Sequence, residues 1–333
     1  MERPLVSVIV PVYNAAEYLK TTVEGLCSQT YRNLEILLIN DGSTDDSPKV
    51  CRELADADSR VRVIDRENGG VSAARNSGLE AASGELIAFC DSDDYPCPTM
   101  IEHLVNIMDE YSCDAVHQRF IMQQEDKTDF TVPAETGEVN VRDTGESVKW
   151  LLTKKEPYGN AVWANLLKRS VTEGVTFPLG VAVGEDKFFV LKAYMNCKNV
   201  AFYEGREYIY VVRCNSIVHD TFSEKHLSSI NNANEILALI EREHPEYTEY
   251  AVVNKYKNYL SNISHIRRFD RSNPVMAEAY KEIITFLKGK KPDYIYGYLS
   301  KNRAFELRLI SFSVPLYRLY TLIKSLAAGI LKR

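Results

Sequence analysis

Short apolar runs rich in β-branched residues alternate with amphipathic segments over the first 90 residues, and this alternation constrains the fold more than any other feature. Continuous apolar runs of this length are typical of strands buried on both faces of a sheet. Strands that alternate with helices form a parallel sheet covered by helices and joined by right-handed crossovers. We therefore predict an α/β fold with strands at 5–12, 34–40, 61–66 and 85–90 and helices at 15–29, 44–58 and 71–83.

The pattern becomes less regular after residue 97. We predict a helix at 98–111, strands at 114–122, 200–205 and 207–213, and a loop or hairpin at 123–145. From about residue 224 onward only helical periodicity is found. Because 333 residues exceed one small core, we predict two domains, 1–222 and 223–333, with the first divided into halves at 1–97 and 98–222.

Composition excludes several classes of protein. The mild net charge of -6 argues against nucleic acid as the main partner. Seven cysteines without CxxC or zinc-site spacing fit reduced thiols in a cytoplasm. The N-terminal segment lacks the features of a signal peptide, and no apolar segment reaches 18 residues without a charge, so we predict no transmembrane span.

Polar and aromatic residues lie where the predicted strands end. Pro11 and Tyr13 close the first strand, Asp41 follows the second within NDGS, and Asn68 follows the third within ENGG. Ligands of open parallel sheets bind beyond the carboxyl ends of the strands. Tyr13 could stack on a nucleobase, and Asp41 could accept a hydrogen bond from a base N–H. Each motif also has a structural explanation, because NDGS and ENGG suit tight turns and Tyr13 could be a packed aromatic.

The fourth predicted strand is followed by DSDD, which contains Asp91, Asp93 and Asp94. Neighbouring buried carboxylates cost several kcal/mol unless a cation neutralises them. Mg²⁺ and Mn²⁺ take oxygen ligands, and such ions commonly bridge one or two carboxylates to substrate phosphates. DSDD therefore favours a metal–phosphate site over a solvated acidic turn. The chain lacks GxxxxGK[ST], and it lacks GxGxxG after the first strand, which argues against a P-loop and a dinucleotide site.

Four motifs occur together in this order: VSVIVPVYNAAEYL, SQTYRNLEILLINDGSTDDS, NGGVSAARNSGLEAASGELIAFCDSDD and GED. Their combination over about residues 5–220 resembles the family 2 glycosyltransferases, which are inverting enzymes that use nucleotide-sugar donors. The resemblance implies the GT-A fold, a Rossmann-like, mostly parallel sheet flanked by helices, here with a C-terminal helical region. It also implies that 1–97 is the nucleotide-binding half and 98–222 the acceptor and catalytic half.

The resemblance implies a role for each site residue. Asp186 of GEDKFFV would be the catalytic base, with Glu185 as the alternative, although acids that begin a helix are often only caps. Arg75 would line the nucleotide pocket, with core anchoring equally open for it. The implied nucleotide-binding residues are Pro11, Tyr13, Asp41, Asn68, Arg75, Asp91 and Arg213, and the implied metal ligands are Asp93, Asp91 and His219.

The function predicted from this resemblance is transfer of a sugar from a nucleotide donor, expected to be UDP-linked, to a hydroxyl of a glycan or lipid-linked oligosaccharide. The product would be a β-glycoside of a cell-surface polysaccharide, and the cofactor Mn²⁺ or Mg²⁺. The alternatives are a nucleotidyltransferase acting on sugar phosphates and a non-catalytic nucleotide-sugar-binding module. A nucleotidyltransferase would be expected to carry a basic, glycine-rich signature after the first strand, and PVYNAAEY lacks one.

The last 33 residues hold seven basic side chains and one acid, Glu306, between apolar and aromatic residues. A basic amphipathic segment of this kind suits an anionic membrane surface, which predicts peripheral membrane contact through 305–333 in a cytoplasmic protein. Packing of a helical domain or a homodimer contact explains the pattern equally well.

Overall fold

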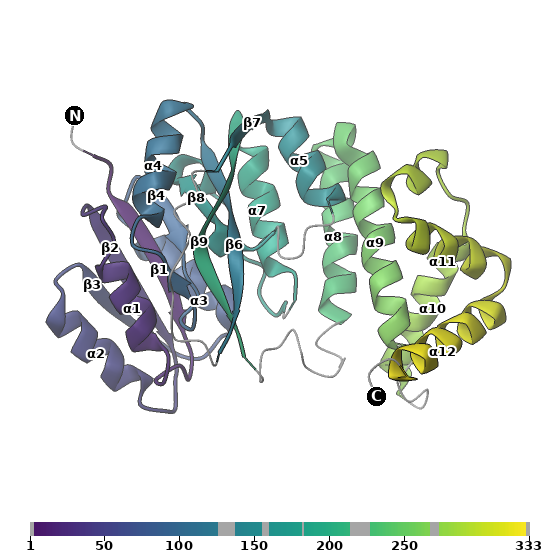
Figure 1. The fold of residues 1–333 in the computed structure, drawn as a ribbon, viewed down its shortest axis with the longest axis horizontal. Coiled ribbons are helices and arrows are strands. Elements are labelled where there is room, and N and C mark those ends of the chain that lie inside the picture. Colours follow the sequence, from purple (N-terminus) through teal and green to yellow (C-terminus); the bar gives the residue numbers. More distant parts are fainter. Residues whose placement is uncertain are drawn as a thin grey trace. The chain divides into compact units, whose positions relative to one another are not determined.

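The protein, seen here in a computed structural model, is described over residues 3–125, 137–154, 160–181, 183–213, 227–266 and 273–330, apart from the side chains of 264–266 and 325–330. The chain divides into two compact units, Met1–Asp220 and Thr221–Arg333. Figure 1 shows a strand-rich first unit and a second unit built from helices.

The first half of unit one is a parallel four-stranded sheet, as predicted, and its strand order is β3-β2-β1-β4. Every residue of β1 and β2 is buried, which explains their continuous apolar runs. The strands are β1 (Val6–Val12), β2 (Leu34–Asp41), β3 (Val61–Arg66) and β4 (Leu86–Phe89), and the helices between them are α1 (Leu19–Cys27), α2 (Ser47–Ala57) and α3 (Val71–Ala81). The predicted α/β class is therefore confirmed.

Helix α3 packs closely on the sheet. A Cβ atom at Gly78 would overlap the side chain of Ile9 in β1, so only glycine allows this approach. The same helix carries Arg75, whose side chain is buried. The close packing of α3 on β1 therefore accompanies the burial of one arginine, Arg75, on this helix.

The second half of unit one makes the sheet mixed rather than mostly parallel. The sheet continues from β4 through β8, β6, β9 and β5; β6 and β9 are parallel, β8 is antiparallel to both of its neighbours, and β7 adds antiparallel to β9. The elements are β5 (Tyr95–Pro96), α4 (Met100–Glu110), β6 (Ala115–Gln124), β7 (Val139–Asp143), α5 (Thr144–Thr153), η1 (Val162–Ala164), β8 (Asn165–Lys168), α6 (Arg169–Thr172), α7 (Glu185–Met195) and β9 (Asn199–Val212).

The predicted strands 200–205 and 207–213 form one strand, β9. Glu204 and Arg206, on either side of Gly205, are exposed, but the backbone there stays extended and shifts its register against β6 near Arg119. β7 lies inside 123–145, the predicted loop or hairpin, and pairs with β9. β8 was not predicted, because four residues give too short a pattern.

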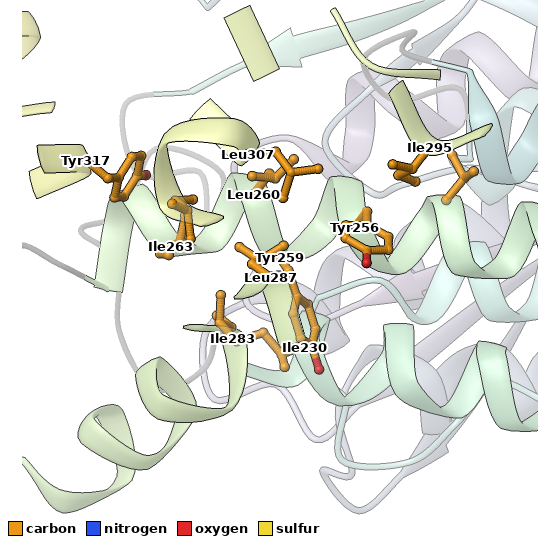
Figure 2. Packing of buried hydrophobic residues seen from close by; sticks show 12 residues of the cluster. Ile230, Tyr256, Tyr259, Leu260, Ile263, Ile283, Leu287, Ile295, Leu307 and Tyr317 are labelled. Carbon is orange, nitrogen blue, oxygen red and sulfur yellow. The ribbon is translucent and has the colours of Figure 1, made fainter. Parts of the chain in front are cut away.

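Unit two is helical, which confirms the predicted C-terminal helical region. Its helices are α8 (Ser228–Glu243), η4 (Pro245–Tyr247), α9 (Thr248–Ile266), α10 (Pro274–Lys288), η5 (Asp293–Tyr298), α11 (Lys301–Phe312) and α12 (Val314–Ile330). Figure 2 shows a core cluster that includes Tyr256, Tyr259 and Leu260 of α9, Leu307 of α11 and Tyr317 of α12. Among the helices of the described segments, none is both long enough and apolar enough to span a bilayer.

Candidate active site

Tyr13 stands exposed directly beyond β1. Its side chain is 53% accessible, whereas Pro11 before it is buried in β1 beside Ile39 of β2. The next residue, Asn14, has a positive φ of 49°, and its side chain accepts a hydrogen bond from the Thr44 N–H at 2.8 Å. The loops after β1 and β2 are thereby tied together, and the Tyr13 ring is left accessible at the carboxyl edge of the sheet.

Asp41 ends β2 with a buried carboxylate that organises the ENGG loop. Its oxygens accept hydrogen bonds from the N–H groups of Gly69 at 3.0 Å and Gly70 at 2.8 Å, and from the Arg66 guanidinium. The Asn68 side chain donates to the Asp41 carbonyl at 3.0 Å. Asp41 and Asn68, which were both predicted to lie at this edge of the sheet, are thus in direct contact. The hydrogen bond of Asp41 to a nucleobase stays a prediction.

Asp94 anchors the DSDD loop to β9. The Asp94 carboxyl group is only 2% exposed and accepts hydrogen bonds from the Tyr208 hydroxyl at 2.8 Å and the Val211 N–H at 2.9 Å. Burial raises the pKa of Asp94 well above its ordinary value, and Asp91 and Asp93 raise it further. This buried side chain positions the loop, and Tyr208 is a partner that the sequence did not indicate.

Asp93 faces a cationic side chain from the end of β9. The Arg213 Nε donates to Asp93 Oδ2 at 3.1 Å, and its guanidinium lies 3.7 Å from the centre of the Tyr18 ring and 3.6 Å from a Glu125 oxygen. Burial and Asp91 raise the pKa of Asp93, while Arg213 opposes that shift. Tyr18 and Glu125 lie beside Arg213 and Asp93, although neither was singled out as a site residue from the sequence.

Arg75 joins the two acidic motifs. Its guanidinium contacts Asp186 at 2.6 Å, Asp91 at 3.1 Å and Glu185 at 3.2 Å, and its side chain is 4% exposed. Three segments that are far apart in sequence, α3, the loop after β4 and the start of α7, therefore meet at one buried cation. The predicted residues Arg75, Asp91, Glu185 and Asp186 are brought together by this contact.

The paired acids of α7 have perturbed protonation. Burial raises the pKa of Glu185 to about 7, with Asp186 adding to the shift and Arg75 opposing it. Burial also raises the pKa of Asp186, again against Arg75. The second oxygen of Asp186 accepts a hydrogen bond from the Val162 N–H at 3.1 Å. A carboxylate whose pKa is raised toward neutrality is suited to accept a proton at physiological pH.

The charges of this site suit a cation bound together with a phosphate. Asp91, Glu185 and Asp186 contact the Arg75 guanidinium, and Asp93 contacts that of Arg213. Within the described ranges, no group of three or more His, Cys, Asp or Glu side chains could hold a metal alone. Asp93 and Asp91 supply oxygen donors, and Mg²⁺ commonly takes one or two protein carboxylates and completes its shell with phosphate oxygens and water. His219 lies outside the described residues.

The mixed sheet, with an acid loop after β4 facing an acidic pair on α7, defines an α/β domain of the GT-A type. In agreement, the structure resembles residues 1–349 of S. aureus TarS in complex with UDP-GlcNAc, with a TM-score of 0.66, 19% identity, and coverage of 92% of this chain and 87% of that one. Residues 7–171 match the model of Glycosyl transferase family 2.

Two relatives from Bacillus subtilis (strain 168) agree with this match. Putative glycosyltransferase EpsH is 36% identical over 222 residues, which cover 66% of this chain and 64% of EpsH. Minor teichoic acid biosynthesis protein GgaB is 27% identical over 320 residues, which cover 92% of this chain and 33% of GgaB. The chain thus spans less than two thirds of either relative. It belongs to the family 2 glycosyltransferases.

Proposed function

We propose that this chain transfers a sugar, with inversion, from a UDP-linked donor to a hydroxyl of a glycan or lipid-linked oligosaccharide. The observation that carries the proposal is the set of ion pairs made by Arg75. They hold Asp91 of the DSDD loop beside Glu185 and Asp186 of α7. The named ligand of TarS, UDP-GlcNAc, supports a UDP donor, and the name of GgaB supports synthesis of a cell-surface polymer. The six free cysteines among the described residues are compatible with a cytoplasmic location.

The proposed reaction is one in-line displacement at the anomeric carbon. Asp186 accepts the proton of the acceptor hydroxyl while its oxygen forms the new bond to that carbon. The bond from the carbon to the nucleoside diphosphate breaks, and the leaving group departs with the electron pair. One displacement inverts the centre, so an α-linked donor gives a β-glycoside. Glu185 remains the alternative base because its pKa is about 7.

The donor would be held along the carboxyl edge of the sheet. Tyr13 would stack on the base, and Arg213 would place positive charge near the diphosphate. Asp93, with Asp91, would hold Mn²⁺ or Mg²⁺, whose chemistry when bound is to stabilise negative charge on the diphosphate. Arg213 pairs with Asp93, so a cation bound at Asp93 would compete with Arg213 for this carboxylate.

Replacing Asp93 with asparagine is expected to abolish the enhancement of UDP affinity by Mn²⁺ and to lower turnover by about 100-fold or more. The amide keeps the size of the side chain and removes the negative charge that a cation requires. Calorimetric titration of UDP with and without Mn²⁺ measures the first effect. Glu125→Gln is the matched control, since it removes the other carboxylate beside Arg213 and should keep the Mn²⁺ dependence. Unchanged Mn²⁺ dependence in Asp93→Asn would refute this metal site.

Replacing Tyr13 with alanine is expected to weaken UDP binding by about 5- to 150-fold, because stacking of a base on an aromatic ring contributes roughly 1–3 kcal/mol. Stability should change little, since the ring is exposed. Tyr111→Ala, at another exposed tyrosine of unit one, should leave UDP affinity unchanged. Equal affinity of Tyr13→Ala and wild type would exclude stacking by this ring.

The alternative functions differ in their products. Incubation with UDP-, GDP- and dTDP-sugars and Mn²⁺ or Mg²⁺ should release the nucleoside diphosphate from one donor. Release of pyrophosphate from a nucleoside triphosphate and a sugar phosphate would indicate a nucleotidyltransferase instead. Binding of a donor without any product, with the acceptor varied, would indicate a non-catalytic module.

A further inference from the structure

Unit two carries a set of exposed apolar side chains at the end of α11 and along α12. We call Phe312, Leu316, Leu319, Leu322 and Ile323 the apolar face. Phe312 is 82% exposed and the other four are between 44% and 57% exposed. Single exposed apolar residues are ordinary, but several together on neighbouring helical turns indicate an interaction surface.

The apolar face is not the side of α12 that packs on the core of unit two. At 3.6 residues per turn, Leu316, Leu319, Leu322 and Ile323 fall within an arc of about 120°. Tyr317 is 1% exposed and points into the core cluster of Figure 2, and Val314 and Tyr320 pack against that cluster. α12 therefore has two apolar sides. One packs on the core of unit two, and the other is exposed.

The sequence segment that carries the apolar face has a positive net charge. Residues 307–333 contain five basic residues and no Asp or Glu. Arg318 donates to the Tyr280 hydroxyl at 3.1 Å, and the Arg308 guanidinium lies 5.0 Å from the centre of the Tyr296 ring. Lys324 pairs with Glu306 at 3.3 Å, and Glu306 is also bound by Arg303. Basic and apolar residues thus occur in the same C-terminal stretch of sequence, which has no acidic residue after Glu306.

These charges distinguish between the two occupants that such a face could take. A second copy of the chain, docked about a two-fold axis, would place the same basic segment against itself, and like charges across an interface are unfavourable. An anionic lipid surface complements both features, since it accepts apolar side chains between headgroups and attracts Lys and Arg.

We propose that the apolar face of α11 and α12 binds the surface of an anionic membrane, with α12 lying along the surface. The helix would insert its leucine and isoleucine side chains to the level of the acyl boundary without crossing the bilayer. This contact is independent of the proposed transferase activity. Together the two would place the site at the surface where lipid-linked acceptors reside.

Cosedimentation of the full chain with vesicles tests the proposal. We expect binding to vesicles of phosphatidylcholine with about 30% phosphatidylglycerol, weaker binding to phosphatidylcholine alone, and weaker binding at high salt. The double variant Leu319→Gln/Ile323→Gln should lower the partition coefficient by about 100-fold or more. Its thermal unfolding and UDP affinity should match wild type, because both side chains are exposed.

Val275→Gln is the matched control, since it replaces an exposed apolar residue on α10 of the same unit and should leave partitioning unchanged. Equal binding of wild type and the double variant, or no binding of wild type to anionic vesicles, would overturn the proposal. Conversion of a dimer to a monomer by the double variant, measured by light scattering without vesicle binding, would overturn it in favour of a second copy. If the protein transfers sugar but does not bind vesicles, the membrane proposal is refuted and the proposed function is not.

Discussion

The Asp186→Asn variant is expected to turn over about 10²–10⁴-fold more slowly than wild type while binding UDP with unchanged affinity. An amide cannot accept the proton of the acceptor hydroxyl. Its carbonyl oxygen can still accept a hydrogen bond from Arg75, so the cluster that holds α7 to the acid loop is largely kept. Initial rates with a saturating donor, and calorimetric titration of UDP, measure the two quantities separately.

Glu185→Gln is the comparison that identifies the base. The two side chains are adjacent, contact the same arginine and have raised pKa values, so a general electrostatic effect should lower turnover similarly in both variants. We expect a smaller loss for Glu185→Gln. Because a base works only when deprotonated, wild-type turnover should rise with pH through an acid limb, and Asp186→Asn should lack this limb. If only Glu185→Gln loses it, Glu185 is the base.

The first half of the sheet was predictable because it obeys one simple rule. Buried parallel strands have continuous apolar sequences, so β1 to β4 lie within a few residues of their predicted positions. The edge at which ligands bind follows from the direction of the strands, and Tyr13, Asp41 and the DSDD loop lie there for that reason.

The partners of the site residues were not predictable, because they depend on contacts between distant segments. No local sequence pattern links Arg75 to its carboxylate partners, because Asp91 is 16 residues away in the chain and Asp186 is 111 residues away. The buried Asp94 gave the same sequence signal as the half-exposed Asp93. Asn165, a polar residue of β8, is 1% exposed, and its side-chain oxygen accepts a hydrogen bond from the Tyr194 hydroxyl at 2.6 Å. Burial and hydrogen-bond partners, which residue type alone does not reveal, distinguish Asp94 and Asn165 from Asp93.

Replacing Arg75 with methionine is expected to lower the free energy of unfolding of unit one by about 3–5 kcal/mol, the range measured when one partner of a buried ion pair is removed. Three carboxylates would lose their shared cation, and Glu185 and Asp186 would repel each other in a buried position. Urea unfolding followed by tryptophan fluorescence reports on this unit alone, because both tryptophans, Trp150 and Trp163, lie within it. Arg62→Met, which removes a half-exposed arginine paired with Glu35, should cost less than about 1 kcal/mol.

The pH dependence of this deficit tests whether charge is its cause. In wild type the pKa of Glu185 is raised from 4.5 to about 7, so its contribution to stability is present below the lower value and is lost as the pH rises through about 7. Removal of Arg75 takes away the cation that opposes this shift, and the pKa values of Glu185 and Asp186 should rise further. The folded variant then binds more protons than folded wild type, and its deficit should grow between about pH 5 and pH 8. A deficit that stays constant over this range would instead assign the loss to the packing of Arg75 on the Phe177 ring.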